Sequence, residues 1–362
     1  MLKKNRNLLL TILAGALLLA FTLWMDKSGV DRYFVRIMQY WAIYIIFGTS
    51  FQLLYGYSGM LSLGHAGLIA IGAYAVALLT TSPQVKMESF LLQPPVQFIA
   101  VAEWPFLPAL IAGAILAAII GSLVATPALR LGGDYLAIVT LGFAEVIRLA
   151  IVNIPSITNG AMGLRSVPLT ATVFSTWAFA LVSLFVFQRF ESSSYGRALL
   201  AIKEDEIGAE ALGINIFKHK VMAFVVSSLF AGIGGGLMAS ILGTIDPNTF
   251  KMALTNIAVT IVVLGGMRSL TGVVIASGIY VVLSEFLRIF ESPMSFMGLQ
   301  WKGIGGIRVL IFGVMLVLII LFVPHGMFGD REFSWDYIFG KFRKWFGKKP
   351  AVNADSNSGG AK

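Results

Sequence analysis

Charged side chains stand in pairs inside two of the most apolar stretches of the sequence. Glu145 and Arg148 are three residues apart, and Glu285 and Arg288 repeat that spacing further along the chain. Residues three apart lie on one face of a helix, so each acid can form an ion pair with its arginine. Charges inside an apolar helix are costly unless they are paired or functional. The pattern therefore favours structural ion pairs that hold helices together over contacts to a substrate.

His65 is another titratable group in an apolar stretch, within the sequence SLGHAG at 62–67. The glycines around it allow helices to approach closely, which favours an interhelical hydrogen bond for the imidazole. A proton relay, or the lining of a path for a solute, is the alternative role of this side chain. The polar residues that could line such a path are Ser58, Ser62, His65, Tyr135, Thr140, Glu145, Arg148 and Asn256.

The residue inventory excludes several kinds of chemistry. The chain has no cysteine, so it has no disulfide, thiol nucleophile or cysteine-ligated metal. It contains three histidines but no HExxH motif, and no serine, histidine and acid stand in a catalytic pattern. It also lacks the GxxxxGK(S/T) loop that cradles nucleotide phosphates. We therefore predict no catalytic residue, no metal site and no cofactor bound by this chain.

The most informative segment, residues 191–216, lies between two strongly apolar stretches. Its sequence, ESSSYGRALLAIKEDEIGAEALGINI, places five acids among small, apolar and basic residues. We expect Ser194 to cap one short helix, over 197–202, and Asp205 to cap a second one, over 206–212. Gly213 stands where a glycine in the left-handed conformation would end that second helix.

The second short helix has two distinct faces. Ile207 and Ala211 share one face, and Glu206 and Glu210 share the neighbouring one. An apolar knob with an acidic flank suits insertion into a groove on another protein. The alternative is an ordinary solvated connector, although most connections between adjacent helices are much shorter than this segment.

The elements that must position these groups are membrane-spanning helices. Of the 362 residues, 57% are apolar and only 12% are charged, against about 45–50% and about 25% in soluble domains. These values exclude a soluble enzyme and predict an all-α, polytopic membrane protein. About ten segments qualify as spans, at 8–25, 36–54, 62–80, 106–126, 134–153, 173–190, 217–241, 254–267, 272–290 and 307–324.

The eighth segment is short and stops at Gly265-Gly266, before Arg268. Such a break predicts a half-helix or re-entrant element, which protein must cover because lipid cannot satisfy its backbone. The first segment follows basic residues, but its apolar run is longer than the core of a secretory signal. We therefore expect it to be a retained first helix.

Basic residues set the expected orientation. Placing the N-terminus in the cytoplasm leaves the majority of the Lys and Arg residues on the inner side, with the excess supplied by the tail. The positive-inside rule then favours both termini in the cytoplasm. We expect residues 1–330 to form the transmembrane domain and 331–362 a basic cytoplasmic tail, disordered at its end. The net charge of +9 reflects this topology and not binding of nucleic acid.

Four stretches make the sequence recognisable. The run GRALLAIKEDEIGAEALGIN (196–215) resembles the cytoplasmic coupling loop of ABC importer permeases, and most of all the M-type permease of the branched-chain amino-acid importer family. Further matches, in the order of the family, are GYSGMLSLGHAGLIAIGAYAVALL (56–79), LRLGGDYLAIVTLGFAEVIRL (129–149) and LGGMRSLTGVVIASGIYVVL (264–283). The resemblance covers about 33–325, whereas 85–105 and the tail after 330 match no pattern of the family.

The resemblance implies an ABC importer permease fold and a subunit of a larger assembly in the bacterial inner membrane. Such a permease pairs with a homologous H-type permease, two ATPase subunits bind the coupling helices, and a periplasmic binding protein delivers the substrate. The chain would pass branched-chain amino acids into the cytoplasm, with ATP and Mg²⁺ held by the partner ATPases. The implied ATPase contact consists of Glu204, Asp205, Glu206, Ile207, Glu210, Ala211, Leu212 and Gly213.

Two other functions stay open. A permease of the same family could import urea or short amides, because the binding protein mostly sets the substrate. An ion-coupled secondary transporter would use Glu145, Glu285 and His65 as coupling groups, but the acidic cytoplasmic helix argues against it.

Overall fold

The computed structural model describes residues 2–90, 93–130, 135–291, 294–296, 299–301, 305–323 and 326–329. The tail expected at 331–362 lies outside these residues. Residues Leu18–Glu332 form one compact unit, which contains the end of helix α1 (Leu2–Lys27) and all the elements that follow it. Outside this unit, the structure describes the first part of α1, up to Leu17.

The described part of the chain is mostly helical and includes a π-helical turn, η1, and two 3-10 turns, η2 and η3. After α1 the elements are α2 (Arg32–Gln52), η1 (Leu53–Tyr57), α3 (His65–Thr80), α4 (Pro83–Ser89), α5 (Gln97–Val101), α6 (Phe106–Ala128), α7 (Tyr135–Asn153), α8 (Pro155–Thr158), η2 (Gly160–Met162), α9 (Val173–Glu191), α10 (Ser194–Glu204), α11 (Glu206–Ala211), α12 (Ile216–Leu242), η3 (Pro247–Phe250), α13 (Met252–Gly265), α14 (Leu270–Glu291), β1 (Met294–Phe296), β2 (Leu299–Trp301) and α15 (Ile307–Phe322).

Each of the ten expected membrane segments contains a helix, so the all-α membrane class is confirmed. Within the described ranges, six helices are long and apolar enough to cross a bilayer: α6, α7, α9, α12, α14 and the stretch Arg32–Tyr57 formed by α2 with η1. Helices α3, α13 and α15 have 16, 14 and 16 residues. A helix of 16 residues rises only about 24 Å. These three are therefore shorter than the core of a bilayer, which is about 30 Å thick.

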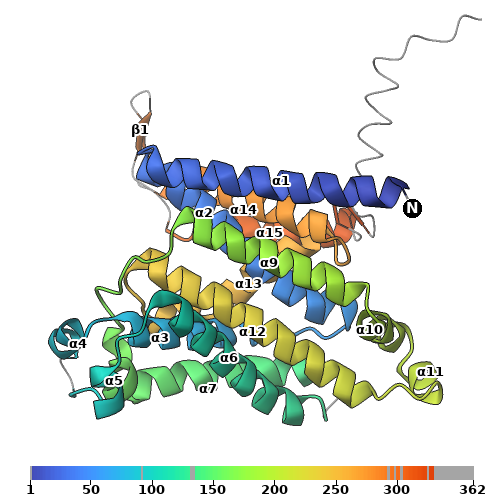
Figure 1. Cartoon of the computed structure of the whole chain (residues 1–362), viewed down its shortest axis with the longest axis horizontal. Coiled ribbons are helices and arrows are strands. Elements are labelled where there is room, and N and C mark those ends of the chain that lie inside the picture. Colours follow the sequence, from blue (N-terminus) through green and yellow to red (C-terminus); the bar gives the residue numbers. More distant parts are fainter. Residues whose placement is uncertain are drawn as a thin grey trace, which may run out of the picture. The chain divides into compact units, whose positions relative to one another are not determined.

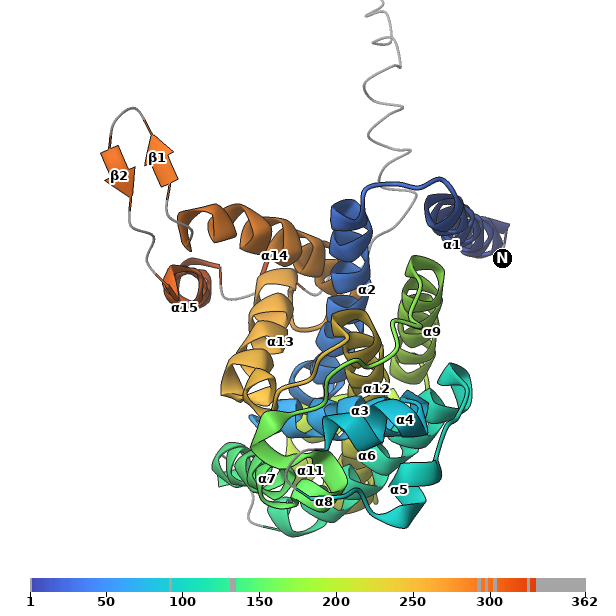
Figure 2. The ribbon, with the colours of Figure 1, turned by 90° about the vertical axis from the view of Figure 1, so that its left-hand side faces the viewer.

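Helix α3 is surrounded by other helices of the unit and packs against α12, α6, α7 and α13 (Figure 2). Nearly all of its residues are buried, as expected for a helix that is apolar on every side. Its contact with α12 is very close: a Cβ atom at Gly72 would lie 2.2 Å from the carbonyl oxygen of Gly232. Small residues are what permit such an approach between membrane helices.

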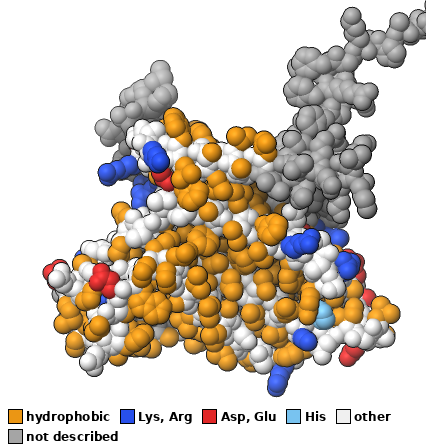
Figure 3. Space-filling view, viewed as in Figure 1, with side chains coloured by type: hydrophobic (Ala, Val, Ile, Leu, Met, Phe, Trp, Pro, Cys, Tyr) orange, Lys and Arg blue, Asp and Glu red, His pale blue; other side chains and the backbone are white. Residues whose placement is uncertain are grey.

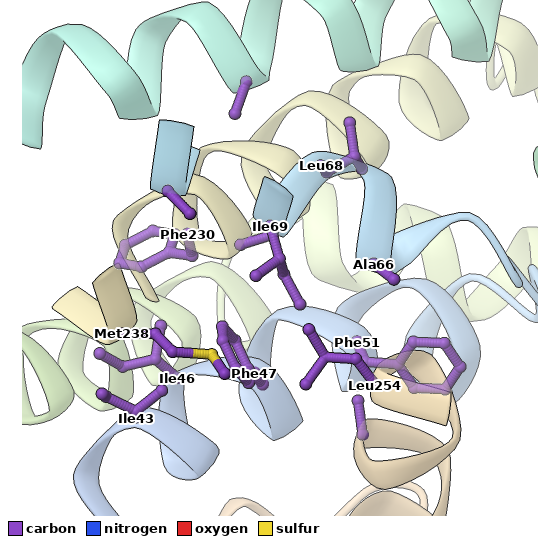
Figure 4. Close-up of a cluster of buried hydrophobic side chains, with 14 of the residues drawn as sticks. Ile43, Ile46, Phe47, Phe51, Ala66, Leu68, Ile69, Phe230, Met238 and Leu254 are labelled. Atoms are coloured by element: carbon purple, nitrogen blue, oxygen red, sulfur yellow. The ribbon is translucent and has the colours of Figure 1, made fainter. Parts of the chain in front are cut away.

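Apolar side chains of four helices meet in one buried cluster (Figure 4). Phe47 and Phe51 of α2 lie in it with Ile69 of α3, Phe230 of α12 and Leu254 of α13. Close-packed aromatic and branched side chains resist displacement, because any shift opens a void or a clash. The cluster therefore holds α2, α3 and α12 in register, and with them the groups at the ends of these helices.

Short helices mark two opposite ends of this unit (Figure 1). α4 and α5 lie at the left of the view, and α10 and α11 lie at the right. On the face shown in Figure 3 the middle is mostly apolar, whereas Lys, Arg, Asp and Glu side chains gather toward the two ends. An apolar middle between charged ends is what a protein that crosses lipid requires, because charged groups in the hydrocarbon core are costly.

The break predicted after the eighth segment is present. α13 ends at Gly265, and Gly266 follows with φ of +116°. Residues 326–329 cover this break, because the N–H groups of Met327 and Phe328 donate to the last carbonyl oxygens of α13. Protein thus satisfies the backbone at the break, as burial in a membrane demands.

A two-stranded antiparallel hairpin connects α14 to α15, with Met294 of β1 opposite Trp301 of β2. The sequence indicated helices only, so this hairpin was not predicted. It is too short to alter the class of the fold.

Candidate functional site

Segment 191–216 folds into the two short helices that the sequence predicts. The first, α10, begins at Ser194, before the expected start. Its cap is Ser193, whose hydroxyl oxygen accepts a 3.3 Å hydrogen bond from the N–H of Gly196. The predicted cap, Ser194, is wrong by one position, because three consecutive serines offer the same capping chemistry.

The second helix, α11, is capped as predicted. A carboxylate oxygen of Asp205 accepts a 3.0 Å hydrogen bond from the N–H of Ile207. Gly213 follows the helix with φ of +81°, the left-handed conformation that ends many helices. A Cβ atom at this position would meet no other atom within 4 Å. The backbone conformation, and not a lack of space, therefore demands a glycine here.

The surface of α11 is exposed and apolar at its two ends. Ile207 and Leu212 are 82% and 81% exposed. Ala209, between them, is buried and belongs to the hydrophobic core. Acidic side chains surround these two apolar groups. The structure thus brings all the predicted coupling residues to one exposed segment: Glu204, Asp205, Glu206, Ile207, Glu210, Ala211, Leu212 and Gly213.

A groove of about 320 Å³ lies beside α11, next to the start of α12. Glu206 and Glu210 of α11 line it together with Phe217 and Lys220 of α12. Lys220 forms an ion pair with Glu206, which fastens α11 to α12. The groove therefore offers acidic, basic and apolar groups to a partner that contacts the exposed helix.

Helix α10 is tied to the membrane helices by a contact that no sequence pattern indicated. Nζ of Lys203 donates a 2.8 Å hydrogen bond to the carbonyl oxygen of Gly56 in η1. Leu199 and Ile202 of α10 are buried and pack in the same core as η1. A lysine in a charged loop normally indicates a solvated side chain, so its sequence context gave no signal for this role.

The turn η1 also contacts the break between α13 and α14. A Cβ atom at Gly56 would lie 1.9 Å from the carbonyl oxygen of Met267, so a glycine is needed for this approach. The hydroxyl of Tyr57 donates to the carbonyl oxygen of Arg268 at 3.3 Å. η1 therefore contacts both α10 and the break at the end of α13.

His65 is fully buried at the start of α3 and makes the expected interhelical hydrogen bond. Its Nε2 lies 2.8 Å from the hydroxyl oxygen of Ser50 in α2. The hydroxyl of Ser227 in α12 donates to the carbonyl oxygen of Ser50 at 2.7 Å. In the part of the chain that the structure describes, Nδ1 of His65 and the hydroxyl of Ser62 have no hydrogen-bond partner. This polar cluster joins three helices in the apolar core.

The other uncharged residues of the predicted path fall into two groups. Thr140 and Ser58 are buried, and Thr140 accepts a 3.1 Å hydrogen bond from the N–H of Leu63. Tyr135 is 68% exposed on α7, and Asn256 is exposed on α13. The structure thus spreads the predicted path over a buried cluster and an exposed surface, and its role in transport stays a prediction.

The first predicted ion pair forms along a single helix. Arg148 pairs with Glu145 within α7. The Glu145 side chain is 52% exposed, on a surface where Ile138 and Val146 are also exposed. The pair was expected to hold two helices together, but it follows the surface of one helix: Glu145 faces outward, and the Arg148 side chain is 18% exposed.

The second predicted ion pair does connect two helices. Arg288 pairs with Glu285 within α14 at 3.5 Å. The hydroxyl of Tyr33 in α2 donates to the same Glu285 carboxylate at 3.3 Å. This pair therefore contributes to the contact between α2 and α14, at the end of α2 that is remote from η1.

Comparison with known proteins gives one consistent result. A family model described as the permease component of the branched-chain amino acid transport system matches residues 33–322. The high-affinity branched-chain amino acid transport system permease protein LivM of Escherichia coli (strain K12) is 33% identical over 332 residues, which cover 82% of this chain and 70% of the relative. LivM of Salmonella typhimurium matches with the same identity and coverage. No solved structure matches the chain.

The second kind of relative is a different permease with a related name. The high-affinity branched-chain amino acid transport system permease protein LivH of Salmonella typhimurium is 28% identical over 189 residues, or 50% of this chain and 56% of the relative. The LivM match is both higher in identity and longer. The family match runs from α2 to the end of α15 and includes α10 and α11. The chain is therefore a member of the permease family of branched-chain amino acid transport systems, and of its M-type branch.

Proposed function

We propose that the chain is the M-type membrane subunit of an ATP-driven importer in the bacterial inner membrane. It passes branched-chain amino acids, delivered by a periplasmic binding protein, into the cytoplasm. The observation that carries this proposal is the exposed, correctly capped helix α11 at one end of the membrane helices. The names of the LivM relatives support branched-chain amino acids over urea or short amides as the substrate.

Helix α11, which we propose as the coupling helix, is suited to contact a motor protein. Ile207 and Leu212 are large apolar side chains that solvent would not favour at 82% and 81% exposure. Burial of one such side chain in a partner groove contributes about 1.5–3 kcal/mol. The acids beside them provide charge that can steer and orient the partner. The motor proteins would be two ATPase subunits. They would bind ATP and Mg²⁺, and no residue of this chain would contact the nucleotide.

Contacts between α10, η1 and the α13–α14 break would transmit a displacement of the coupling helix to the membrane helices. Lys203 joins α10 to the carbonyl of Gly56, and η1 contacts the α13–α14 break at Met267. Hydrogen-bonded and closely packed contacts move together, whereas exposed loops do not. ATP-driven closure of the motors would therefore shift η1 and the broken helix, and switch access from the outside to the inside.

We propose that α7 provides the surface that contacts the second permease. Glu145, paired with the half-buried Arg148, lies exposed among apolar side chains such as Ile138 and Val146. An ion pair facing lipid is costly, so this surface is better suited to face another protein or a polar path. We place the homologous H-type permease against α7, with the substrate passing between the two chains.

Co-purification tests the ATPase contact. Ile207→Asp places a charge where the apolar knob would enter the ATPase, and the ATPase subunits of the system should no longer co-purify with the permease. The matched control is Leu169→Asp, which changes a 72% exposed leucine at the other end of the unit and should retain the ATPase. Equal ATPase recovery with the wild-type chain and both variants, at equal permease abundance, would refute the coupling assignment.

A further inference from the structure

A charged hollow of about 510 Å³ lies at the end of the unit opposite α10 and α11. Its walls come from the start of α2, the loop after α12, the end of α14 and the start of α15. Because η1, at the other end of the α2 span, contacts α10, the start of α2 is remote from the coupling segment. We call this hollow the arginine basin; its charged lining residues are Arg36, Asp246, Glu285, Arg288 and Arg308.

The arginines of the basin are only partly neutralised. Within the described part of the chain, the exposed Arg36 guanidinium has neither an ion pair nor a hydrogen bond. Arg288 is 62% exposed and pairs with Glu285 only at 3.5 Å. Arg308 pairs with Glu291 at 3.4 Å. A planar guanidinium with unused donors is well suited to bind a carboxylate.

The acids of the basin are arranged differently. Asp246 is exposed, and one of its oxygens accepts a 2.7 Å hydrogen bond from the N–H of Asn248. This hydrogen bond comes from a neutral group, and Asp246 forms no ion pair with any residue that the structure describes. Glu285 is already engaged by Arg288 and by the Tyr33 hydroxyl. Asp246 is therefore the acid available to a cationic group.

Apolar side chains form the rest of the wall. Tyr44 of α2, Met238 of α12 and Val281 of α14 line the basin beside the charged groups. Met238 and Val281 are almost entirely buried, so neighbouring side chains hold this part of the wall in place. One hollow thus combines a cation, an anion and an apolar wall, which are the three groups that an apolar α-amino acid needs.

We infer that the arginine basin is a binding site for a zwitterionic amino acid with an apolar side chain. The carboxylate of the ligand binds Arg36, its ammonium group binds Asp246, and its side chain packs toward Met238 and Val281. This inference rests on the proposed function, which makes an amino acid the substrate and places this end of the unit outside. The basin then receives the amino acid before it reaches the path between the two permeases.

Equilibrium binding tests this site directly. The full chain, with the subunits that co-purify, is placed in lipid nanodiscs without the binding protein and titrated with radiolabelled L-leucine. Saturable binding is expected, and unlabelled L-leucine should displace it. L-leucinamide lacks the carboxylate and 4-methylpentanoate lacks the ammonium group, so neither should compete at the same concentration.

Two conservative variants assign the charges. Arg36→Gln and Asp246→Asn should each weaken leucine binding by about tenfold or more, the effect of losing one charged hydrogen bond. Asn at 246 keeps an oxygen for the turn at Asn248, so folding is preserved. The matched controls, Arg165→Gln and Glu88→Gln, change exposed residues of the same charges outside the basin and should bind like the wild type.

The outcomes separate this inference from the proposed function. Leucine uptake by the assembled wild-type system is measured in parallel. Normal uptake without saturable binding, or with binding unaffected in both basin variants, overturns the basin and leaves the transport function intact. Competition by L-leucinamide or 4-methylpentanoate as strong as that by L-leucine also overturns it. A wild-type system that takes up no branched-chain amino acid refutes the proposed function itself.

Discussion

Lys203 of α10 donates a 2.8 Å hydrogen bond to the carbonyl oxygen of Gly56, which lies 147 residues earlier in the chain. The bond joins α10, one face of which is buried, to the π-helical turn that ends the first complete span of the unit. A bond between a charged donor and a carbonyl is stronger than one between two neutral groups. It is therefore the most direct mechanical connection between the proposed motor contact and the membrane helices.

Replacement of Lys203 tests this connection. Lys203→Met keeps the length and the apolar stem of the side chain but removes the donor to Gly56. We expect ATPase subunits to bind as before, because α11 is unchanged, while ATP-dependent leucine uptake falls several-fold. Uptake and ATPase co-purification are measured on the same membranes. The control is Lys218→Met, an exposed lysine on the neighbouring helix, and uptake equally reduced in both variants would contradict the connection.

The acidic flank and the end of α11 provide the second prediction. Glu210→Lys reverses an exposed charge of the coupling helix, and Gly213→Val forces a β-branched residue into a conformation with φ of +81°. Each change should weaken the binding of the ATPase subunits to this chain by about 2 kcal/mol, which is roughly 30-fold in affinity. Uptake should be lost while membrane insertion and abundance stay normal. Normal uptake in either variant at normal abundance would count against the coupling role.

The hydrogen bond between Ser50 and His65 provides a prediction of stability. Ser50→Ala removes the partner of a fully buried imidazole nitrogen, and an unsatisfied buried group costs about 1–3 kcal/mol. The thermal unfolding midpoint in detergent should therefore fall by several degrees. Ser183→Ala is the control, because the equally buried Ser183 hydroxyl donates to the carbonyl oxygen of Ala180 in its own helix and, within the described ranges, to no other helix.

The same variant distinguishes a structural role for His65 from a proton relay. If the imidazole only joins helices, Ser50→Ala lowers stability but leaves the dependence of leucine uptake on external pH unchanged. A shifted pH profile in Ser50→Ala, with the profile of Ser183→Ala unchanged, would indicate that His65 takes part in proton movement.

The ion pair on α7 gives a prediction about assembly. Glu145→Gln leaves Arg148 as an unpaired cation on an apolar surface, and an unpaired charge is costly at a protein contact. Recovery of the H-type permease with the variant should drop. Exchanging the charges, with Glu145→Arg and Arg148→Glu together, should restore much of it. Unchanged recovery in Glu145→Gln would place the second permease on another surface.

Much of the fold was predictable because local patterns determine it. The apolar segments, the break at Gly265, the cap at Asp205 and the glycine at Gly213 all depend on neighbouring residues. These features were confirmed. Two of the three short helices, α3 and α15, are shorter than the segments predicted at 62–80 and 307–324, whereas α13 has the predicted length. A hydropathy pattern counts apolar residues such as Leu63, although this residue precedes the first residue of α3.

The contacts that organise the site were not predictable, because they join distant parts of the chain. No local pattern indicates that Lys203 reaches Gly56, or that η1 winds as a π-helix. The arginine basin is similar, since Arg36, Asp246 and Arg308 belong to three separate segments. The position of Glu145 also depends on packing: the sequence indicated a pair, but only the fold shows that it faces outward.

Uptake of radiolabelled leucine into proteoliposomes tests the central claim most directly. The vesicles contain this chain, the H-type permease and the two ATPase subunits, with ATP on the side of α11 and the loaded binding protein on the other. Uptake should require hydrolysable ATP, stop with a non-hydrolysable analogue and persist when an uncoupler abolishes the proton gradient. Uptake that continues without the ATPase subunits and follows the proton gradient would contradict the account and favour an ion-coupled transporter.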